Sequence, residues 1–306
     1  MKVKWLLVGL GIQGAKRARL LDKKIVATID PFNLSADFKS IDELDKDFDI
    51  AAICVPDPQK AEIALQILRM GKSCLIEKPY PVFTEAEELE VKKLISEKGV
   101  FLYTAYNHRF EPAITDLKNL LNSGKIGTPI FSSFRYGNGT LDERLKSSWK
   151  TSGANLAFDL GSHVLDLYEF LFNEFPSRLN LDQSLNHSNS GQSYLRFSCE
   201  KAIFETSYFF WKSDFHIEIY GTEGSLFLQG LQKWGPATLI LHSRVFPSGV
   251  PNETRWTFEG PDPTWEKEHQ NVEQMFFQIE SFQGVLKDFR LNQLIIANLH
   301  ENALNK

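Results

Sequence analysis

The sequence feature that most constrains the fold is a short apolar run that stops abruptly at a glycine-rich turn. Trp5–Val8 is apolar and follows polar lysines, which predicts a short buried β-strand. Gly9, Gly11 and Gly14 come next, in the spacing G-x-G-x-x-G. In this pattern the first glycine allows a tight turn, the second lets the backbone approach a pyrophosphate, and the third lets a helix pack on the strand. The run therefore predicts a strand, a turn and a helix N-terminus that bind a dinucleotide.

An acidic residue stands where a dinucleotide-binding fold needs one. The second apolar run, Ile25–Ile29, ends at Asp30, about 20 residues after the glycine motif begins. A carboxylate at this place accepts hydrogen bonds from the ribose hydroxyls of the cofactor. The alternative interpretation is a simple turn residue before Pro31. Because Pro31 and Phe32 offer no cation to a 2′-phosphate, the sequence predicts NAD rather than NADP as the cofactor.

Bulk composition excludes several classes of protein. The 306 residues include 34 basic and 39 acidic side chains, and the net charge of -5 predicts no general affinity for nucleic acid. No apolar run reaches the roughly 18 residues that span a bilayer, and no secretory signal is evident, so we expect a cytoplasmic protein with no membrane partner. The three cysteines, Cys54, Cys74 and Cys199, lie far apart in apolar runs and are typical of reduced core residues.

The first part of the chain alternates between strand-like and helix-like segments. Further buried strands are expected at residues 50–55, 73–76 and 100–104, and helices at residues 59–70 and 85–97. This alternation is typical of a parallel sheet that helices cover on both faces. We therefore predict an N-terminal Rossmann dinucleotide-binding domain at residues 1–122, whose last element is an amphipathic helix.

The second part, residues 123–306, changes to a period of two that is typical of antiparallel strands with one buried face. Strands are expected at residues 130–136, 193–199, 202–210, 217–220 and 225–228, the last two joined as a hairpin. Helices are expected at Ser162–Phe172 and, as one long amphipathic helix, at residues 272–286, with a loop at residues 180–192. The fold class is therefore α/β, with a second α+β domain built on a large, mostly antiparallel open sheet.

The predicted helices of this second domain are too few to cover both faces of its sheet. An uncovered apolar face tends to pair with its symmetry mate, so we expect a homodimer or homotetramer. The segment 230–265 shows no clear pattern and stays unassigned.

A charged pair and a proline follow the strand expected at residues 73–76. Glu77, Lys78 and Pro79 would lie at the carboxyl end of a parallel strand, where ligands of such sheets bind. Lys78 could donate to a substrate hydroxyl there and take part in proton transfer. A solvated Glu-Lys pair is the alternative. The proline restricts the local backbone, and the Lys78-Pro79 bond is a candidate for the cis form.

A second polar cluster stands at the start of an otherwise apolar helix. If Ser162 caps that helix, His163 lies in its first turn, with Asp159 just before it and Asp166 one turn on. The two carboxylates could set the tautomer of His163 and raise its basicity, as acid–base catalysis needs. A structural histidine is the alternative. No set of residues shows metal-ligand spacing, so we expect no metal.

Five motifs, in this order, resemble the glucose-fructose oxidoreductase / inositol dehydrogenase / MocA (Gfo/Idh/MocA) family. They are Gly-Leu-Gly-Ile-Gln-Gly at 9–14, Glu-Lys-Pro at 77–79, Asn-His-Arg-Phe at 107–110, Gly-Lys-Ile-Gly at 124–127 and Asp-Leu-Gly-Ser-His-Val-Leu-Asp at 159–166. The resemblance extends from residue 1 to about residue 228. It implies a Rossmann domain that binds NAD(P), a second α/β domain with an open sheet, and a sugar or cyclitol oxidised between the two. It also implies that Lys78, His163 and Asp159 are the catalytic residues.

Two sets of binding residues are expected. The expected cofactor-binding residues are Gly9, Gly11, Ile12, Gln13, Gly14, Asp30, Val55, Pro56, Gln59, Glu77, Lys78 and Asn107. The candidate substrate-binding residues are Tyr106, Arg109, Tyr136, Trp149, Lys150 and His163. One departure concerns Lys60, because many members of the family carry a histidine there, which leaves the contacts on the nicotinamide side open.

The main hypothesis is an NAD-dependent oxidoreductase that transfers hydride between nicotinamide and a secondary alcohol of a sugar. The sugar could be nucleotide-linked, for example a UDP-sugar oxidised at C3. In this hypothesis Lys78 holds the reacting hydroxyl, His163 transfers the proton and Asp159 orients His163. The rival is a non-catalytic, NAD(H)-bound regulator or sensor that keeps the fold, against which the presence of all three residues argues.

Overall fold

The computed structural model describes residues 2–142, 156–187, 192–278 and 282–300. The chain forms two compact units: the first is Met1–Ala105 with Trp265–Arg290, and the second is Tyr106–Thr264 with Leu291–Lys306. Two segments therefore belong to other units than the predicted domain boundary at residues 122–123 assigns them to. The helix expected to close the first domain belongs to the second unit, and part of the C-terminal region belongs to the first.

Five parallel strands form the sheet of the first unit, in the order β2-β1-β3-β4-β5. They are β1 (Trp5–Val8), β2 (Ile25–Ile29), β3 (Ile50–Ile53), β4 (Ser73–Ile76) and β5 (Leu102–Thr104). Every residue of β1, β3, β4 and β5 is buried, as expected for a parallel sheet with helices on both faces. The predicted Rossmann-type sheet is confirmed, with β3 two residues shorter than the apolar run.

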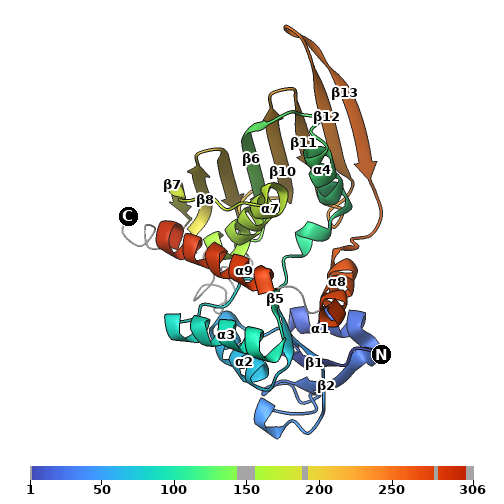
Figure 1. The fold of residues 1–306 in the computed structure, drawn as a ribbon, viewed down its shortest axis with the longest axis vertical. Coiled ribbons are helices and arrows are strands. Elements are labelled where there is room, and N and C mark those ends of the chain that lie inside the picture. The colour runs from blue at the N-terminus through green and yellow to red at the C-terminus, as the bar shows by residue number, and fades with distance from the viewer. Residues whose placement is uncertain (1, 143–155, 188–191, 279–281, 301–306) are drawn as a thin grey trace. The chain divides into compact units, whose positions relative to one another are not determined.

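Helices lie on both sides of this sheet (Figure 1), with α1 and α8 on one side and α2 and α3 on the other. Their bounds are α1 (Ile12–Leu21), α2 (Asp57–Arg69), α3 (Glu85–Lys98), α8 (Thr264–Gln278) and α9 (Phe282–Ile295). The C-terminal part of α9 belongs to the second unit. Two short 3-10 turns also occur, η1 (Asp22–Lys24) and η2 (Ile41–Glu43). The ends of α3 show why the sequence forms a helix here. Thr84 and Glu87 make a reciprocal capping box, and Gly99 ends the helix in the left-handed region at φ 61°.

The second unit is built on an eight-stranded sheet in the order β13-β12-β11-β10-β6-β9-β8-β7. The strands are β6 (Pro129–Gly137), β7 (Asn180–Asn186), β8 (Gln192–Cys199), β9 (Ala202–Ser207), β10 (Asp214–Gly221), β11 (Gly224–Gln229), β12 (Ala237–Val245) and β13 (Gly249–Phe258). The β6–β9 pair is parallel and the others are antiparallel. The mostly antiparallel sheet and the β10–β11 hairpin are therefore confirmed.

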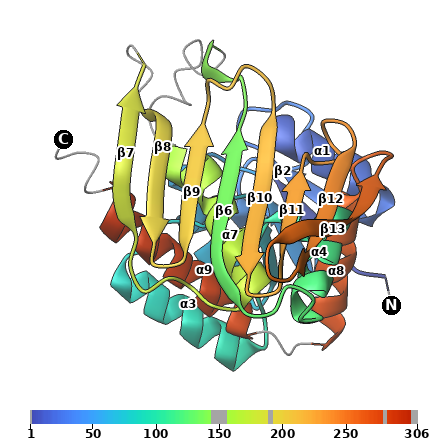
Figure 2. The same cartoon turned by 90° about the horizontal axis from the view of Figure 1, so that it is seen from above.

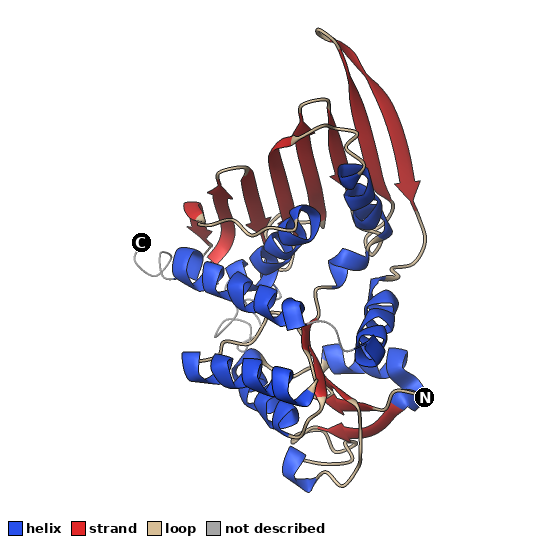
Figure 3. Cartoon of the chain, viewed as in Figure 1, coloured by secondary structure: helices blue, strands red, loops and turns tan. Residues whose placement is uncertain are grey.

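Side chains alternate across this sheet because successive residues of a strand face opposite sides. In β6, Phe134 and Tyr136 are buried while Ser133 and Arg135 are only half-buried. Helices α4 (Pro112–Asn122) and α7 (Ser162–Phe172) lie on the same side of the sheet (Figure 2). Short helical turns complete the unit: η3 (Asn107–Phe110), the π-helical turns η4 (Ala157–Gly161) and η6 (Ile296–His300). Figure 3 shows how strands dominate this unit.

Three segments differ from the sequence predictions. Residues 180–192 were expected as a loop, but β7 forms there as an edge strand whose side chains are mostly exposed, so it needs no apolar period. The unassigned segment 230–265 contains β12 and the polar, exposed β13. The single helix expected at 272–286 is wrong, since two helices, α8 and α9, cover this region.

The N-terminus of α7 also differs from the prediction. Ser162 does not cap the helix, because its backbone and that of Gly161 are already helical and its hydroxyl donates to the carbonyl of Phe158 at 2.6 Å. The helical backbone continues upstream through η4, so Asp159 lies inside a π-helical turn. Such turns are frequent at functional sites. None of the helices in the described ranges has the length and apolar character that a bilayer crossing requires.

Candidate functional site

The glycine-rich turn after β1 is tightly packed at two positions and open at the third. Gly9 has a φ of +90°, and a Cβ atom there would lie 2.7 Å from the carbonyl oxygen of Cys54. A Cβ on Gly14 would lie 1.9 Å from the carbonyl oxygen of Gly9. A Cβ on Gly11 would meet no atom within 4 Å. The turn thus has open space at the glycine whose backbone is expected to approach a pyrophosphate, and the exposed N-terminus of α1 begins beside it at Ile12.

The carboxylate of Asp30 accepts hydrogen bonds from backbone N–H groups of the neighbouring turns and is held in its ionised form. Its Oδ2 accepts from the N–H of Leu10 at 2.8 Å, and its Oδ1 accepts from the N–H groups of Phe32 and Asn33, both at 2.9 Å. Desolvation acts to raise the pKa of this carboxyl, but the three backbone donors together outweigh it and lower the pKa. A carboxylate has about four acceptor sites, so ribose hydroxyls can bind it as well. The turn and the cofactor interpretations of Asp30 are therefore compatible.

These residues fit a dinucleotide. The glycine turn offers open space and helix N–H groups for phosphates, and Asp30 offers ionised acceptors for a ribose. Val55, Pro56 and Gln59 follow the carboxyl end of β3, where Pro56 and Gln59 are exposed. Asn107 belongs to the second unit, and its amide donates to the hydroxyl of Thr264 at 2.7 Å.

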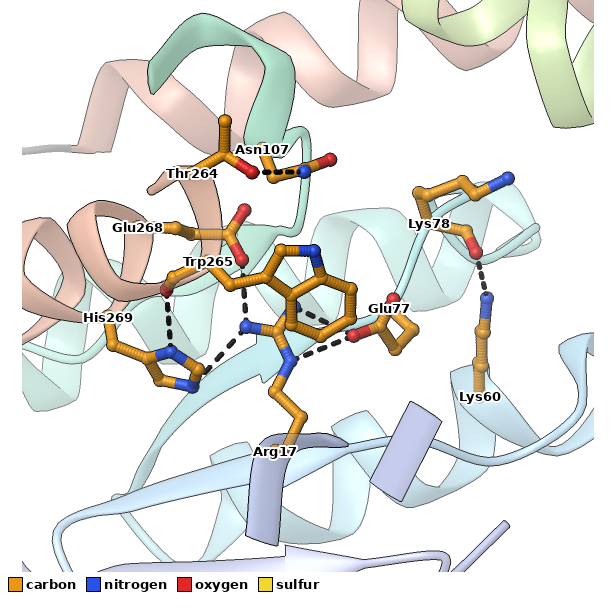
Figure 4. Close-up of polar contacts among 9 residues, drawn as sticks. All are labelled: Arg17, Lys60, Glu77, Lys78, Asn107, Thr264, Trp265, Glu268 and His269. Atoms are coloured by element: carbon orange, nitrogen blue, oxygen red, sulfur yellow. Dashed lines mark hydrogen bonds and ion pairs between the residues drawn. The ribbon is translucent and has the colours of Figure 1, made fainter. Parts of the chain in front are cut away.

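Glu77, at the end of β4, is part of a buried charge cluster (Figure 4). Arg17 donates through Nε to Glu77 Oε1 at 2.8 Å and through Nη1 to Glu268 Oε2 at 2.8 Å. Its guanidinium lies 4.3 Å from the ring centroid of Trp265 and contacts His269 Nε2 at 3.3 Å. Burial opposes the charge of Arg17, yet the two carboxylates outweigh burial and raise its pKa. The side chain of Glu77 is therefore occupied within the protein.

His163 is 5% exposed and lies among aromatic rings of the second unit. Its ring centroid is 4.6 Å from that of His108, 5.6 Å from that of Tyr106 and 5.7 Å from that of Tyr136. The structure thus brings together three of the predicted substrate residues, Tyr106, Tyr136 and His163. Such packing holds an imidazole in one orientation, which a proton-transferring group needs.

The two carboxylates near His163 also bind other side chains. Asp159 Oδ2 accepts a hydrogen bond of 2.8 Å from the hydroxyl of Tyr208. Asp166 is buried and forms a bidentate ion pair with Arg109, whose Nε donates to both carboxylate oxygens at 2.9 and 3.0 Å. The positive charge of Arg109 is therefore balanced inside the protein by the carboxylate of Asp166.

Sequence reasoning missed three residues of this cluster. His108 is 2% exposed, and its Nε2 lies 3.3 Å from the hydroxyl of Tyr136. Lys233 donates to the same hydroxyl at 3.2 Å and lies 4.1 Å from the ring centroid of Trp234. The motif at 107–110 contained His108, but Lys233 and Trp234 are in the unassigned segment, where no sequence signal marked them.

Two predicted substrate residues, Trp149 and Lys150, lie outside the described residues. The part of the chain that the structure describes contains no group of three or more His, Cys, Asp or Glu side chains that could hold a metal ion. Its three cysteines are free thiols, and burial raises the pKa of each of them.

Comparisons with known proteins agree with this geometry. Residues 3–106 match the family model described as "Oxidoreductase family, NAD-binding Rossmann fold", and residues 114–227 match the "GFO/IDH/MocA C-terminal domain". A levoglucosan dehydrogenase of Pseudarthrobacter phenanthrenivorans is 28% identical over 150 residues, which cover 47% of this chain and 38% of that protein. The scyllo-inositol 2-dehydrogenase (NAD(+)) of Bacillus subtilis is 27% identical over 203 residues, which cover 61% of this chain and 57% of that protein.

Among solved structures, a levoglucosan dehydrogenase in complex with NADH has the same fold. Its TM-score is 0.82 at 16% identity, over 100% of this chain and 98% of that one. The chain spans only about two fifths of the length of the levoglucosan dehydrogenase sequence that it matches. From the two family models and the structural match, this chain belongs to the Gfo/Idh/MocA family of oxidoreductases and carries its NAD-binding Rossmann fold.

Proposed function

We propose that this protein is an NAD-dependent dehydrogenase that oxidises a secondary ring alcohol of a sugar or cyclitol. The observation that carries this proposal is the burial of His163 among the rings of Tyr106, His108 and Tyr136. A regulator would need no imidazole held in this way. The names of the relatives, which include dehydrogenases of levoglucosan and scyllo-inositol, support the class of substrate.

The residues of the chain would divide the chemistry between them. When bound, NAD supplies the hydride acceptor. The ammonium of Lys78 would donate to the reacting oxygen and stabilise the negative charge that develops there as hydride leaves. Neutral His163 would accept the hydroxyl proton in the oxidative direction and return it in the reductive direction. Asp159, held by its hydrogen bond from Tyr208, would orient His163.

A nucleotide-linked sugar, such as a UDP-sugar oxidised at C3, is the finer form of this proposal. It requires cations for the diphosphate, and Arg109 is already paired with Asp166. Lys233 remains close to the His163 cluster through its bond to Tyr136. Judged on the residues that the structure describes, which do not include Lys150, we favour an uncharged or singly charged ring alcohol over a nucleotide sugar.

A substrate panel tests the proposal. Purified protein with NAD⁺ would be mixed with levoglucosan, scyllo-inositol, glucose and UDP-glucose, and the near-ultraviolet absorbance of NADH would be followed. We expect NADH to form with at least one uncharged ring alcohol. Binding of NADH without turnover of any alcohol would instead support the rival hypothesis, a non-catalytic NAD(H)-bound sensor.

A further inference from the structure

A buried lysine that the proposed mechanism does not use lies directly behind Lys78. Lys60, in the first turns of α2, is 2% exposed. Its ammonium donates to the carbonyl oxygen of Lys78 at 2.9 Å and to that of Pro79 at 3.2 Å. It also lies 2.7 Å from a carboxylate oxygen of Asp57. The three N–H donors of this ammonium therefore have three acceptors, two of which are the main-chain carbonyls of Lys78 and Pro79.

Burial of this ammonium is costly, and its contacts offset that cost only in part, so the pKa of Lys60 is lowered. Desolvation lowers the pKa of Lys60, while the carboxylate of Asp57 acts to raise it. A leucine or methionine would fill the same space without the cost of desolvating a charge. A cation at this position therefore has a specific use, and the geometry shows that use as two hydrogen bonds to the backbone.

The residue before Lys78 is held from the other side. Arg17 of α1 binds the carboxylate of Glu77, and its guanidinium is 1% exposed. Two buried cations, from α1 and from α2, thus restrain three consecutive residues, 77–79. In Figure 4 the side chain of Lys78 extends away from Lys60, whose hydrogen bonds are to the backbone of residues 78 and 79.

We propose that Lys60 is a positioning residue, which places the ammonium of Lys78 by holding the carbonyl groups of Lys78 and Pro79. This inference rests on the proposed role of Lys78 in catalysis. It also answers the question raised by the departure at position 60. Lys60 is turned toward the main chain of residues 78 and 79, and its long side chain reaches the two carbonyls.

The test compares two substitutions in the full-length protein. Lys60→Met keeps most of the length of the side chain, which becomes one atom shorter, but removes all three donors. Lys72→Met is the matched control, because it removes the ion pair of a half-buried lysine with the exposed Asp47, at 2.6 Å, directly before the opposite end of strand β4. With NAD⁺ and scyllo-inositol or levoglucosan, Lys60→Met should lower kcat on the order of 10- to 100-fold, as misplacement of a catalytic group does. NADH affinity and the KM of the alcohol should stay unchanged, Lys60→Arg should recover part of kcat, and Lys72→Met should match the wild type.

A double-mutant cycle with Lys78→Met separates this inference from the proposed function. If Lys60 acts through Lys78, adding Lys60→Met to Lys78→Met should lower kcat no further. Additive losses, or an unchanged kcat in Lys60→Met, would overturn the positioning role. Full turnover in Lys78→Met would instead overturn the proposed function.

A crystal structure gives a readout that does not depend on turnover. In Lys60→Met the carbonyl groups of Lys78 and Pro79 should shift, together with the Lys78 ammonium. Unshifted main-chain atoms would contradict the inference even if no alcohol in the panel is a substrate. Should Lys60→Met fail to fold, Lys60→Arg and Lys60→Gln take its place, with a partial loss of kcat expected and a wild-type kcat in both as the contrary result.

Discussion

Alanine substitutions of Gly14 and Gly11, two glycines of the same turn, should distinguish an effect on folding stability from an effect on cofactor affinity. Gly14→Ala places a Cβ 1.9 Å from the carbonyl oxygen of Gly9, so the start of α1 and the turn must move apart. Gly11→Ala places a Cβ where no atom of the protein lies within 4 Å. Gly11 has a φ of -68°, which alanine adopts without strain. The first change therefore acts on packing and the second on whatever occupies the open space.

The magnitudes follow from these contacts. Overpacking against backbone costs about 1 to 3 kcal/mol, so Gly14→Ala should lose at least that much free energy of unfolding. Gly11→Ala should stay within about 1 kcal/mol of the wild type, because the gain from a less flexible unfolded chain and the loss of a helix-capping glycine are both small. If the pyrophosphate contacts the backbone of Gly11, the added methyl group should weaken NADH binding by about tenfold or more, which is about 1.4 kcal/mol.

Two assays measure these effects on the same samples. Urea denaturation gives the free energy of unfolding, and fluorescence titration gives the Kd of NADH. A wild-type Kd for NADH in Gly11→Ala would show that the open space beside Gly11 is not the phosphate site. Wild-type stability in Gly14→Ala would show that the turn does not depend on the close packing of Gly14 against Gly9.

Four further outcomes are expected. Asp30 should make the protein bind NADH more tightly than NADPH in parallel titrations, and tighter NADPH binding would contradict its role. His163→Ala should lower turnover about 10²- to 10⁴-fold while NADH still binds, whereas near-normal turnover with an unchanged pH profile would move proton transfer to Lys78. Burial and the charge of Arg17 lower the pKa of His269 from 6.5 to about 3, so between these pH values the unfolded chain binds a proton that the folded chain does not, and stability falls as the pH falls. Between about pH 7.5 and about pH 5, the wild type should therefore lose about 2 kcal/mol more free energy of unfolding than His269→Gln. Equal losses in the two proteins would show that His269 is not buried in its neutral form. Light scattering at micromolar concentration should show a homodimer or homotetramer, and a monomer would contradict the expected pairing of the open sheet.

The first unit was largely predictable because local patterns determine it. The apolar run of β1 ends at a glycine turn. β3 and β4 are buried on both faces, so each appears as a short apolar run, which in β4 follows Ser73. Residues of the candidate site were also predictable where a single short motif contains them. Glycine spacing identified the turn, and the residues 77–79 stood at the carboxyl end of a strand that the sequence already marked.

The features that sequence reasoning missed depend on the fold rather than on local pattern. Strand β7 is a polar edge strand, and β13 is exposed, so neither shows a buried face in its sequence. The ion pair of Arg17 with Glu268 joins residues 251 positions apart, and no local rule connects them. In the same way, lysine is a residue type that usually lies on the surface, and Lys60 becomes buried only when α2 packs behind the end of β4.

Transfer of hydrogen from a labelled alcohol to the cofactor tests the central claim most directly. The protein would be incubated with NAD⁺ and scyllo-inositol, levoglucosan or glucose carrying deuterium on the ring carbons, and the NADH formed would be analysed by mass spectrometry. The proposed dehydrogenase predicts NADH that carries one deuterium, at a rate that His163→Ala reduces by the factor given above. Tight NADH binding with no deuterium in the cofactor, for any of these alcohols, would contradict the claim and favour an NAD(H)-bound sensor.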